Sequence, residues 1–253
     1  MRSMISWLRG AISGASTYPP APDGVTLYAV GDIHGRSDCL AQAHERIDRD
    51  KARLFAEDRA VEIYLGDYID RGPDSRGVID RLIARSARAE TVMLIGNHEM
   101  IMQSFFSGQT SFEEWRMVGG LETLLSYGAE AGELLRGESP VRPAELAALI
   151  PAAHRRFLAE LLGYQLFGRY CFVHAGLRPG KPIEEQSIED LAWIRDEFLN
   201  HRGDFGSIVV HGHTPVNEIE FMPNRINIDT GAFATNRLSV VRIDGDGPSV
   251  LET

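Results

Sequence analysis

The octet Tyr-Leu-Gly-Asp-Tyr-Ile-Asp-Arg at residues 64–71 decides the fold of this chain. It follows the alternating apolar residues of segment 61–65, which is typical of a buried strand, and it ends in two carboxylates and a guanidinium. A carboxylate at Asp67, just past a strand, is well placed to hold a cation. Taken alone, however, the octet is explained equally well as a salt-bridged loop.

The same arrangement recurs elsewhere in the chain: an apolar run, a glycine, and then residues of the types that bind metals. The recurrences are Gly31–Gly35 (GDIHG), Gly96–Glu99 (GNHE), His174–Gly176 (HAG) and His211–Thr214 (HGHT). Repetition at strand ends is hard to reconcile with unrelated salt-bridged loops. It indicates that several polar loops meet at one edge of a sheet.

The hydrophobic periodicity predicts an α/β fold. We expect strands at 25–30, 61–65 and 92–95, separated by helices that begin near Ser37 or Asp38 and at 78–87. Alternating strands and helices imply a largely parallel sheet, whose ligands lie beyond the carboxyl ends of the strands.

The rest of the chain predicts a helical insert and a second sheet. Segment 100–162 reads as mostly helical, without a catalytic constellation. After it we expect a hairpin of 164–167 with 170–173, a helix at 188–199, and strands at 208–210, 225–228, 238–243 and 250–252. This pattern predicts two packed mixed sheets flanked by helices. Residues 1–24 are expected to be a tail and linker, and 25–253 one catalytic domain.

Composition excludes several classes of protein. The chain has 253 residues and a formal charge of -10, which argues against nonspecific binding to nucleic acid or anionic membranes. Two cysteines do not make a disulfide framework, so a reducing, cytoplasmic location is expected. No apolar run approaches the ~20 residues of a membrane span, and segment 1–10 is too short and polar for a signal peptide. The oligomeric state is left open.

The side chains after the expected strands suit a pair of divalent metal ions. The candidate ligands are Asp32, His34, Asp67, Asn97, His174 and His213. Imidazole suits Mn, Fe, Zn or Ni, while carboxylate and amide oxygens suit Mn, Mg or Fe, so manganese is expected and Fe, Zn or Ni are alternatives. Two ions ~4 Å apart need a bridging carboxylate, and together they can activate water against a phosphoryl group.

Three further residues have matching roles. His98, beside Asn97, could donate a proton to the leaving oxygen, and Asp70 could orient its imidazole. Arg71 could grip two phosphoryl oxygens with its planar guanidinium, which a lysine would do less well.

These residues resemble the motifs of a known family. It resembles the PPP phosphoprotein phosphatases of the calcineurin-like metallophosphoesterase superfamily, most closely small bacterial and phage members. The matching blocks are GDIHG (31–35), GDYIDRG (66–72), GNHE (96–99), HAG (174–176), GHTP (212–215) and IDTG (228–231). They occur in the family's order, and the resemblance implies its four-layer fold, a β-sandwich between helices.

The resemblance also assigns roles to individual residues. It implies a first metal ion bound by Asp32, His34 and Asp67, and a second bound by Asp67, Asn97, His174 and His213, with Asp67 bridging. His98 would be the acid paired with Asp70, and Arg71, Arg195 and Asn97 would contact the substrate. His211 is interpreted as a neighbour of the site rather than a ligand.

The implied activity is hydrolysis of phosphoserine, phosphothreonine or phosphotyrosine in proteins or peptides. The same metal centre occurs in relatives that cleave diadenosine polyphosphates symmetrically, which is the alternative. A catalytically dead phosphoprotein-binding module is the third hypothesis, although all expected ligands and the acid are present. Ile95 stands where eukaryotic members carry an arginine, so eukaryotic-type partners are not implied.

Overall fold

The computed structural model describes residues 18–54, 58–135 and 143–252. Residues 1–17 of the predicted tail and linker at 1–24 lie outside these residues. Residues 18–24, expected to be part of a linker, are packed against the fold: Ala21 is buried and its backbone N–H donates to the carbonyl of Asp244 at 2.8 Å.

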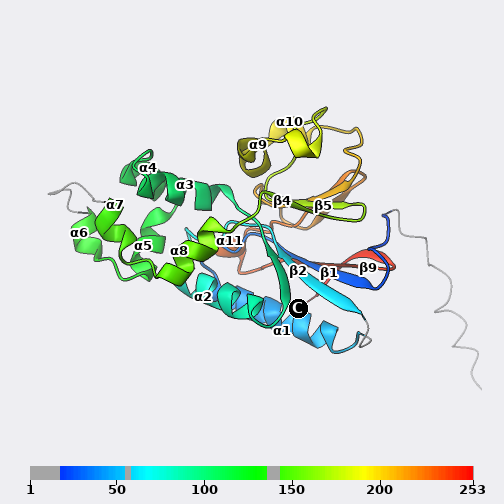
Figure 1. Ribbon diagram of the computed structural model, residues 1–253, viewed down its shortest axis with the longest axis horizontal. Coiled ribbons are helices and arrows are strands. Elements are labelled where there is room, and N and C mark those ends of the chain that lie inside the picture. Colours follow the sequence, from blue (N-terminus) through cyan, green and yellow to red (C-terminus); the bar gives the residue numbers. More distant parts are fainter. Residues whose placement is uncertain (1–17, 55–57, 136–142, 253) are drawn as a thin grey trace, which may run out of the picture.

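Two five-stranded sheets form the centre of the molecule (Figure 1). The first has the order β10 (Gly247–Val250), β9 (Val240–Asp244), β1 (Val25–Val30), β2 (Arg59–Tyr64), β3 (Glu90–Met93). The second has the order β4 (Tyr164–Phe167), β5 (Tyr170–Val173), β6 (Ile208–His211), β8 (Arg225–Asn227), β7 (Glu220–Met222). Strands β1, β2 and β3 are parallel, as are β5, β6 and β8.

Helices lie outside both sheets. α1 (Ser37–Lys51) and α2 (Ser75–Ser86) cover the first sheet, while α9 (Ile188–Trp193) and α10 (Asp196–Leu199) lie beyond the second (Figure 1). The predicted α/β sandwich flanked by helices is therefore confirmed. The other helices are α3 (Asn97–Phe106), α4 (Phe112–Met117), α5 (Gly120–Ser126), α6 (Ala131–Leu135), α7 (Pro143–Ala147), α8 (Ala152–Ala159), η1 (Ile183–Glu185) and α11 (Ala232–Thr235).

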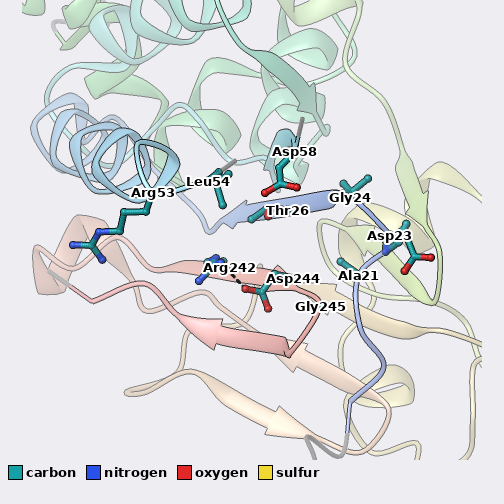
Figure 2. A pocket seen from close by; sticks show the side chains of 12 residues that line it. Ala21, Asp23, Gly24, Thr26, Arg53, Leu54, Asp58, Arg242, Asp244 and Gly245 are labelled. Atoms are coloured by element: carbon teal, nitrogen blue, oxygen red, sulfur yellow. Dashed lines mark ion pairs between the residues drawn. The ribbon is translucent and has the colours of Figure 1, made fainter. Parts of the chain in front are cut away.

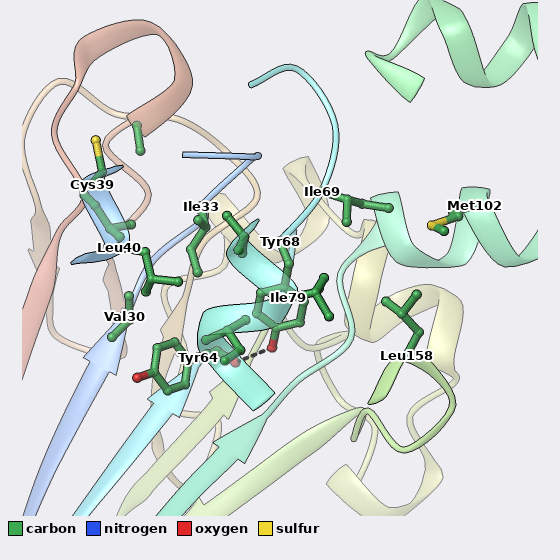
Figure 3. Close-up of a cluster of buried hydrophobic side chains, with 14 of the residues drawn as sticks. Val30, Ile33, Cys39, Leu40, Tyr64, Tyr68, Ile69, Ile79, Met102 and Leu158 are labelled. Carbon is green, nitrogen blue, oxygen red and sulfur yellow. Dashed lines mark hydrogen bonds between the residues drawn. The ribbon is translucent and has the colours of Figure 1, made fainter. Parts of the chain in front are cut away.

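Alternation along the first sheet supplies both of its faces with core side chains. In β1, Leu27 and Ala29 pack between the two sheets, whereas Tyr28 and Val30 face the helices. Figure 3 shows the helix-side cluster, in which the Tyr68 hydroxyl donates to the carbonyl of Tyr64 at 3.1 Å. Because both faces are covered, the polar loops can gather only at the strand ends.

One buried charge cluster lies away from the strand ends. Glu62, in the middle of β2, is fully buried and forms ion pairs with Lys51 and with Arg85, the latter at 2.6 Å. Arg85 also pairs with Asp48 at 2.5 Å, and the Tyr64 hydroxyl donates to Glu62 at 2.6 Å. This network joins α1, β2 and α2.

Some local predictions were wrong. Neither Ser37 nor Asp38 caps α1, because Arg36 occupies the N-cap position and makes no side-chain capping bond. The expected helix 188–199 is split at residues 194–195, where the backbone of Ile194 is extended. Strand β7 was not predicted, and the last strand lies at Gly247–Val250 rather than 250–252 because it pairs back on β9 through a short turn.

Along the described part of the chain, no helix combines the length and the apolar composition that a bilayer crossing requires. Cys39 and Cys171 are both buried and unbridged.

Candidate metal centre

The carboxyl ends of the parallel strands in both sheets bring the predicted ligands together. Asp32 follows β1, Asp67 follows β2, and Asn97 is the first residue of α3 after β3. From the second sheet, His174 follows β5 and His213 follows β6. The predicted convergence of separate strand ends is therefore what the fold produces.

Two overlapping groups of side chains could each hold a metal ion. The first is His34, Asp67 and His98, and the second is Asp67, His174 and His213; within each group the ligand atoms lie within 4.8 Å of one another. Asp67 belongs to both groups: its Oδ2 lies 3.4 Å from His34 Nε2, and its Oδ1 lies 3.4 Å from His174 Nε2. This shared carboxylate occupies the place that a bridging ligand requires.

Asn97 and Asp32 are the two predicted ligands outside these groups, and the first group contains His98, the predicted acid, in place of Asp32. The amide oxygen of Asn97 lies 3.1 Å from His174 Nε2 and 2.9 Å from His213 Nδ1. Asp32 is buried, and its Oδ2 accepts the backbone N–H of His213 at 3.0 Å. All six predicted ligands are buried at these strand ends.

The backbone fixes which ring nitrogens face Asp67. His34 Nδ1 donates to the carbonyl of Ile69 at 2.9 Å, and His174 Nδ1 donates to the carbonyl of Leu65 at 3.0 Å. With a proton held on Nδ1, Nε2 of each ring faces Asp67 and offers a lone pair when the ring is neutral. Burial lowers the pKa of His174, but the charges of Asp67 and Asp32 outweigh burial and raise it to about 10, so His174 must lose its Nε2 proton to bind a metal ion. Such second hydrogen bonds are typical of metal-binding histidines, because they set the tautomer and the orientation of the ring.

The site residues are held in strained backbone conformations. Six described residues other than glycine have positive φ, and five of them belong to the site: His34 (46°), Asp67 (49°), Asp70 (70°), Arg71 (66°) and His213 (65°). Each such conformation costs on the order of 1–3 kcal/mol and persists only where the surrounding structure imposes it. Their concentration here supports a functional role for these loops.

Burial and neighbouring charges both shift the pKa values of the site's titratable groups. Burial lowers the pKa of His34 and of His213 to about 3, so both rings are neutral and able to coordinate. Burial and the charge of Asp229 raise the pKa of Asp32 well above its ordinary value. Burial opposes ionisation of Asp67, but the charges of His174 and His98 outweigh it and hold the pKa of Asp67 well below 3.8.

Unsatisfied polar atoms test whether these residues fit metal ions. Asp32 Oδ1 and His213 Nε2 are buried and have no hydrogen-bond partner among the described residues. Burying such atoms without a partner is costly, and a cation would give the carboxylate oxygen one. An oxygen- and nitrogen-donor set without thiolate suits Mn, Fe, Zn or Ni. The residues present therefore fit a pair of divalent ions.

His98, Asp70 and Arg71 form a second functional group beside the ligands. His98 Nδ1 lies 2.7 Å from Asp70 Oδ2, and its Nε2 lies 3.1 Å from a terminal nitrogen of Arg71. Burial lowers the pKa of His98, but the charges of Asp67 and Asp70 outweigh burial and raise it above 6.5. The Arg71 guanidinium also lies over the ring of Phe233, 4.8 Å from its centroid. The predicted pairing of His98 with Asp70 is thus present.

Glu99 supports the site without having been predicted as a site residue. This carboxylate is fully buried and accepts the backbone N–H groups of Asp67 and Gly96, both at 2.9 Å, and of Tyr68 at 2.8 Å. It ties the loop after β2 to the start of α3. Its place within the GNHE block is a signal that could have identified it.

The helical insert also reaches the site, although its sequence shows no catalytic constellation. Trp115 Nε1 donates to Asp70 at 3.0 and 3.2 Å, and the Thr123 hydroxyl donates to Asp70 at 2.6 Å. The Gly119-Gly120 pair marks this close approach, because a glycine pair between helices allows backbones to come near each other.

Two other residues named from the sequence lie at the edge of the site. Arg195 is exposed at the start of α10, and its charge adds to the effect of burial in lowering the pKa of His213. His211 is buried with Nε2 3.4 Å from Arg225 and Nδ1 3.1 Å from the carbonyl of Gly212. His211 makes its contacts away from the ligand groups, in keeping with its interpretation as a neighbour.

The other end of the strands in the first sheet differs from the metal-ligand end. A hollow of about 290 Å³ lies at the start of β1 and the end of β9, lined among others by Asp23, Asp58, Arg242 and Asp244 (Figure 2). Arg242 pairs with Asp244 at 2.6 Å, so charges of both signs meet there. The histidine-rich end of the sheet is the one arranged for cations.

Comparison with known proteins decides the family. The family model described as calcineurin-like phosphoesterase matches residues 25–242 of this chain. The chain belongs to this family. Its resemblance to calcineurin-like metallophosphoesterases is thereby confirmed, and the dimetal chemistry of the family agrees with the two ligand groups.

The relatives carry two kinds of name. The chain is 28% identical over 237 residues to bis(5'-nucleosyl)-tetraphosphatase PrpE [asymmetrical] of Anoxybacillus flavithermus, covering 84% of this chain and 88% of that protein. It is 29% identical over 224 residues to serine/threonine-protein phosphatase 1 of Salmonella typhimurium, covering 86% and 91%. A cold-active protein-tyrosine phosphatase of a psychrophilic Shewanella species shares the fold, with a TM-score of 0.55, 13% identity, and coverage of 90% and 80%.

Proposed function

We propose that this metallophosphoesterase is a phosphoprotein phosphatase that hydrolyses phosphoserine, phosphothreonine or phosphotyrosine monoesters. One observation carries the proposal: His98 Nε2 lies 3.1 Å from the Arg71 guanidinium and 3.9 Å from Asp67 Oδ2. A proton donor, a phosphate-binding fork and the carboxylate shared by both ligand groups thus surround one small space. The name of the Salmonella relative supports the same activity.

The residues of the chain supply binding and proton transfer. Two divalent ions, which we expect to be manganese, would supply the positive charge that activates a water molecule and neutralises the phosphoryl oxygens. Arg71 binds phosphoryl oxygens, because its planar fork matches their geometry and Phe233 supports its face. His98 donates a proton from Nε2 to the leaving oxygen, and Asp70 accepts the hydrogen bond from Nδ1–H and so orients the ring.

Substitution of the proton donor tests this proposal. In metal-loaded protein, His98→Asn should lower phosphate release from phosphopeptides by about 10²–10⁴-fold while both metal ions stay bound. His154→Asn is the matched control, because His154 is a buried histidine of α8 whose partners are Tyr127 and Asp80. Full activity of His98→Asn would overturn the proposed mechanism.

The names of the PrpE relatives favour a second candidate, hydrolysis of dinucleoside tetraphosphates. Diadenosine tetraphosphate and phosphopeptides should therefore be offered side by side to the same metal-loaded sample. A higher kcat/KM for phosphopeptides supports the first proposal, and a far higher kcat/KM for the dinucleotide replaces it with the second. The products then report the position of cleavage: two ADP from symmetrical cleavage, or ATP and AMP from asymmetrical cleavage.

A further inference from the structure

The Asp70 carboxylate is surrounded by donors that come mainly from the helical insert. It is fully buried, and His98 Nδ1 lies 2.7 Å from its Oδ2. Trp115 Nε1 reaches Oδ2 at 3.0 Å and Oδ1 at 3.2 Å, while the Thr123 hydroxyl donates to Oδ1 at 2.6 Å. Both of these side chains are also fully buried. Two of the three groups bonded to this carboxylate therefore lie on α4 and α5, far from the strand-end motifs.

A glycine pair allows this part of the insert to dock. Gly119 has φ of +107°, and a Cβ atom there would lie 2.5 Å from the backbone nitrogen of Arg71. The Arg71 N–H donates to the carbonyl of Gly119 at 3.2 Å. At Gly120, a Cβ atom would collide with the Trp115 ring. The insert thus contacts both the phosphate-binding arginine and the partner of the proton donor.

The chemistry of the donors gives this contact a consequence. An indole N–H can only donate. The Thr123 oxygen accepts the backbone N–H of Asp70 at 2.8 Å and lies 3.0 Å from Ser75 Oγ; because an ionised carboxylate can only accept, it is the Thr123 proton that lies between Thr123 and Asp70 Oδ1. With these bonds in place, the Asp70 carboxylate keeps one orientation, and its remaining acceptor position points to His98 Nδ1. The imidazole is then held with Nε2 beside Arg71.

We propose that Trp115 and Thr123 are positioning residues for proton donation to the leaving group. They act through Asp70 on His98 and touch neither metal ligands nor substrate. The inference rests on the proposed role of His98 as the acid. It assigns part of the catalytic apparatus to the helical insert.

A purely structural role is the competing explanation. Trp115 packs against Phe105 and Phe106, with ring centroids 5.0 and 5.8 Å away, so a substitution could act by loosening the insert. The two explanations differ in their dependence on the leaving group. A weakly basic leaving group departs without a proton, whereas a strongly basic one needs the acid. Loss of positioning should therefore harm only substrates of the second kind.

The experiment measures hydrolysis of a series of aryl phosphates. The series begins with phenyl phosphate, whose leaving group is strongly basic, and ends with 2,4-dinitrophenyl phosphate, whose leaving group is weakly basic. Trp115→Phe keeps the ring and removes the N–H donor, and Thr123→Val keeps the shape and removes the hydroxyl. In metal-loaded protein we expect kcat for phenyl phosphate to fall about 10–100-fold in each variant. The value for 2,4-dinitrophenyl phosphate and the metal content should stay close to those of the wild type.

Two further variants make the result decisive. Phe105→Leu alters the packing around Trp115 without touching Asp70, so it should leave the leaving-group dependence unchanged. Thr123→Ser retains a hydroxyl donor and should restore the wild-type profile. If Trp115→Phe does not fold, the Val and Ser variants at position 123 decide the question.

The inference is overturned if the wild type depends on the leaving group but Trp115→Phe and Thr123→Val lower kcat equally for all esters, or not at all. A different result marks failure of the proposed function itself. In that case metal-loaded wild type would hydrolyse none of the esters, or His98→Asn would retain the wild-type dependence on the leaving group.

Discussion

Glu62 and Asp67 are both buried carboxylates on or just after β2, yet their surroundings are opposite. Glu62 lies mid-strand and has permanent cations beside it, with ion pairs to Lys51 and Arg85. Asp67 lies at the strand end, and its ion-pair partners among the described residues are histidines alone, His34, His98 and His174.

The difference extends to the neighbours of Asp67. Asp32 and Asp229 are also buried at this end of the sheet, and the described ion pairs include no lysine or arginine partner for either. Burial and the charge of Asp67 raise the pKa of Asp229 to about 6, against the lowering effects of the Gly231 hydrogen bond and of the charges of His174 and Arg71. A buried carboxylate is tolerated when it is paired or bound to metal. The comparison teaches that Glu62 is neutralised by lysine and arginine, which stay protonated, whereas Asp67 is paired with histidines, which can give up a proton and bind metal ions instead.

The largest effect that sharpens this comparison is expected at Asp67. Asp67→Asn removes the carboxylate shared by both ligand groups, so phosphatase activity should fall by at least about 10³-fold and metal binding should weaken at both sites. Near neutral pH the metal-free variant should also be less stable than the metal-free wild type, because the charges of His174 and His98 outweigh burial, hold the pKa of Asp67 well below 3.8 and so stabilise its ionised form. Metal analysis, kinetics and urea unfolding measure the three quantities. Retained activity with both metals bound would break the comparison.

Glu62→Gln should lower stability and leave metal binding and activity unchanged. It leaves Lys51 and Arg85 facing a neutral amide in a buried position, so the free energy of unfolding should fall by about 3 kcal/mol. The metal content and kcat of the folded fraction should match the wild type, since none of these residues touches the site. Urea unfolding beside enzyme kinetics tests this. A selective loss of activity would contradict the structural assignment of Glu62.

The stabilising effect of Glu62, measured with the same variant, should depend on pH. Burial raises the pKa of Glu62, but hydrogen bonds from Arg85, Lys51 and Tyr64 outweigh it and hold the pKa below its ordinary 4.5. A depressed pKa in the folded state gives stability that is present above pH 4.5 and is lost as the pH falls through the folded-state value. The difference in unfolding free energy between wild type and Glu62→Gln should therefore be constant near neutrality and shrink in acid. A difference that grows as the pH falls would show that the pKa of Glu62 is raised in the folded protein rather than lowered.

Lys51→Met should give the smallest effect. Lys51 is 20% exposed, and Arg85 still pairs with Glu62 when the ammonium is removed. We expect a loss of about 1 kcal/mol in the free energy of unfolding and no change in activity. Thermal and urea unfolding report it. A loss as large as that of Glu62→Gln would mean that Lys51, rather than Arg85, is the main neutralising partner.

Sequence patterns were informative where they repeat a local rule. The strand-end blocks predicted the convergence of Asp32, Asp67 and Asn97, because parallel strands end at the same edge of a sheet. The hairpin of β4 and β5 was predicted with its correct bounds from two apolar runs around Gly168-Arg169. Strand β7 was missed because its three residues are too few to show a period.

The supporting residues could not be predicted because their partners are distant in the chain. Thr123 lies 53 residues from Asp70 and Trp115 lies 45 residues from it, and neither stands in a pattern that signals a catalytic partner. Glu62 likewise read as one residue of a strand, since its partners Lys51 and Arg85 lie on two different helices. Such contacts follow from packing, which single-sequence periodicity does not encode.

The most direct test of the central claim is anomalous diffraction from crystals grown with manganese. The account predicts two anomalous peaks per chain at the strand ends, both in contact with Asp67. The first should also contact Asp32 and His34. The second should contact Asn97, His174 and His213. Absence of peaks at this site under saturating manganese, or peaks bound by other residues, would contradict it.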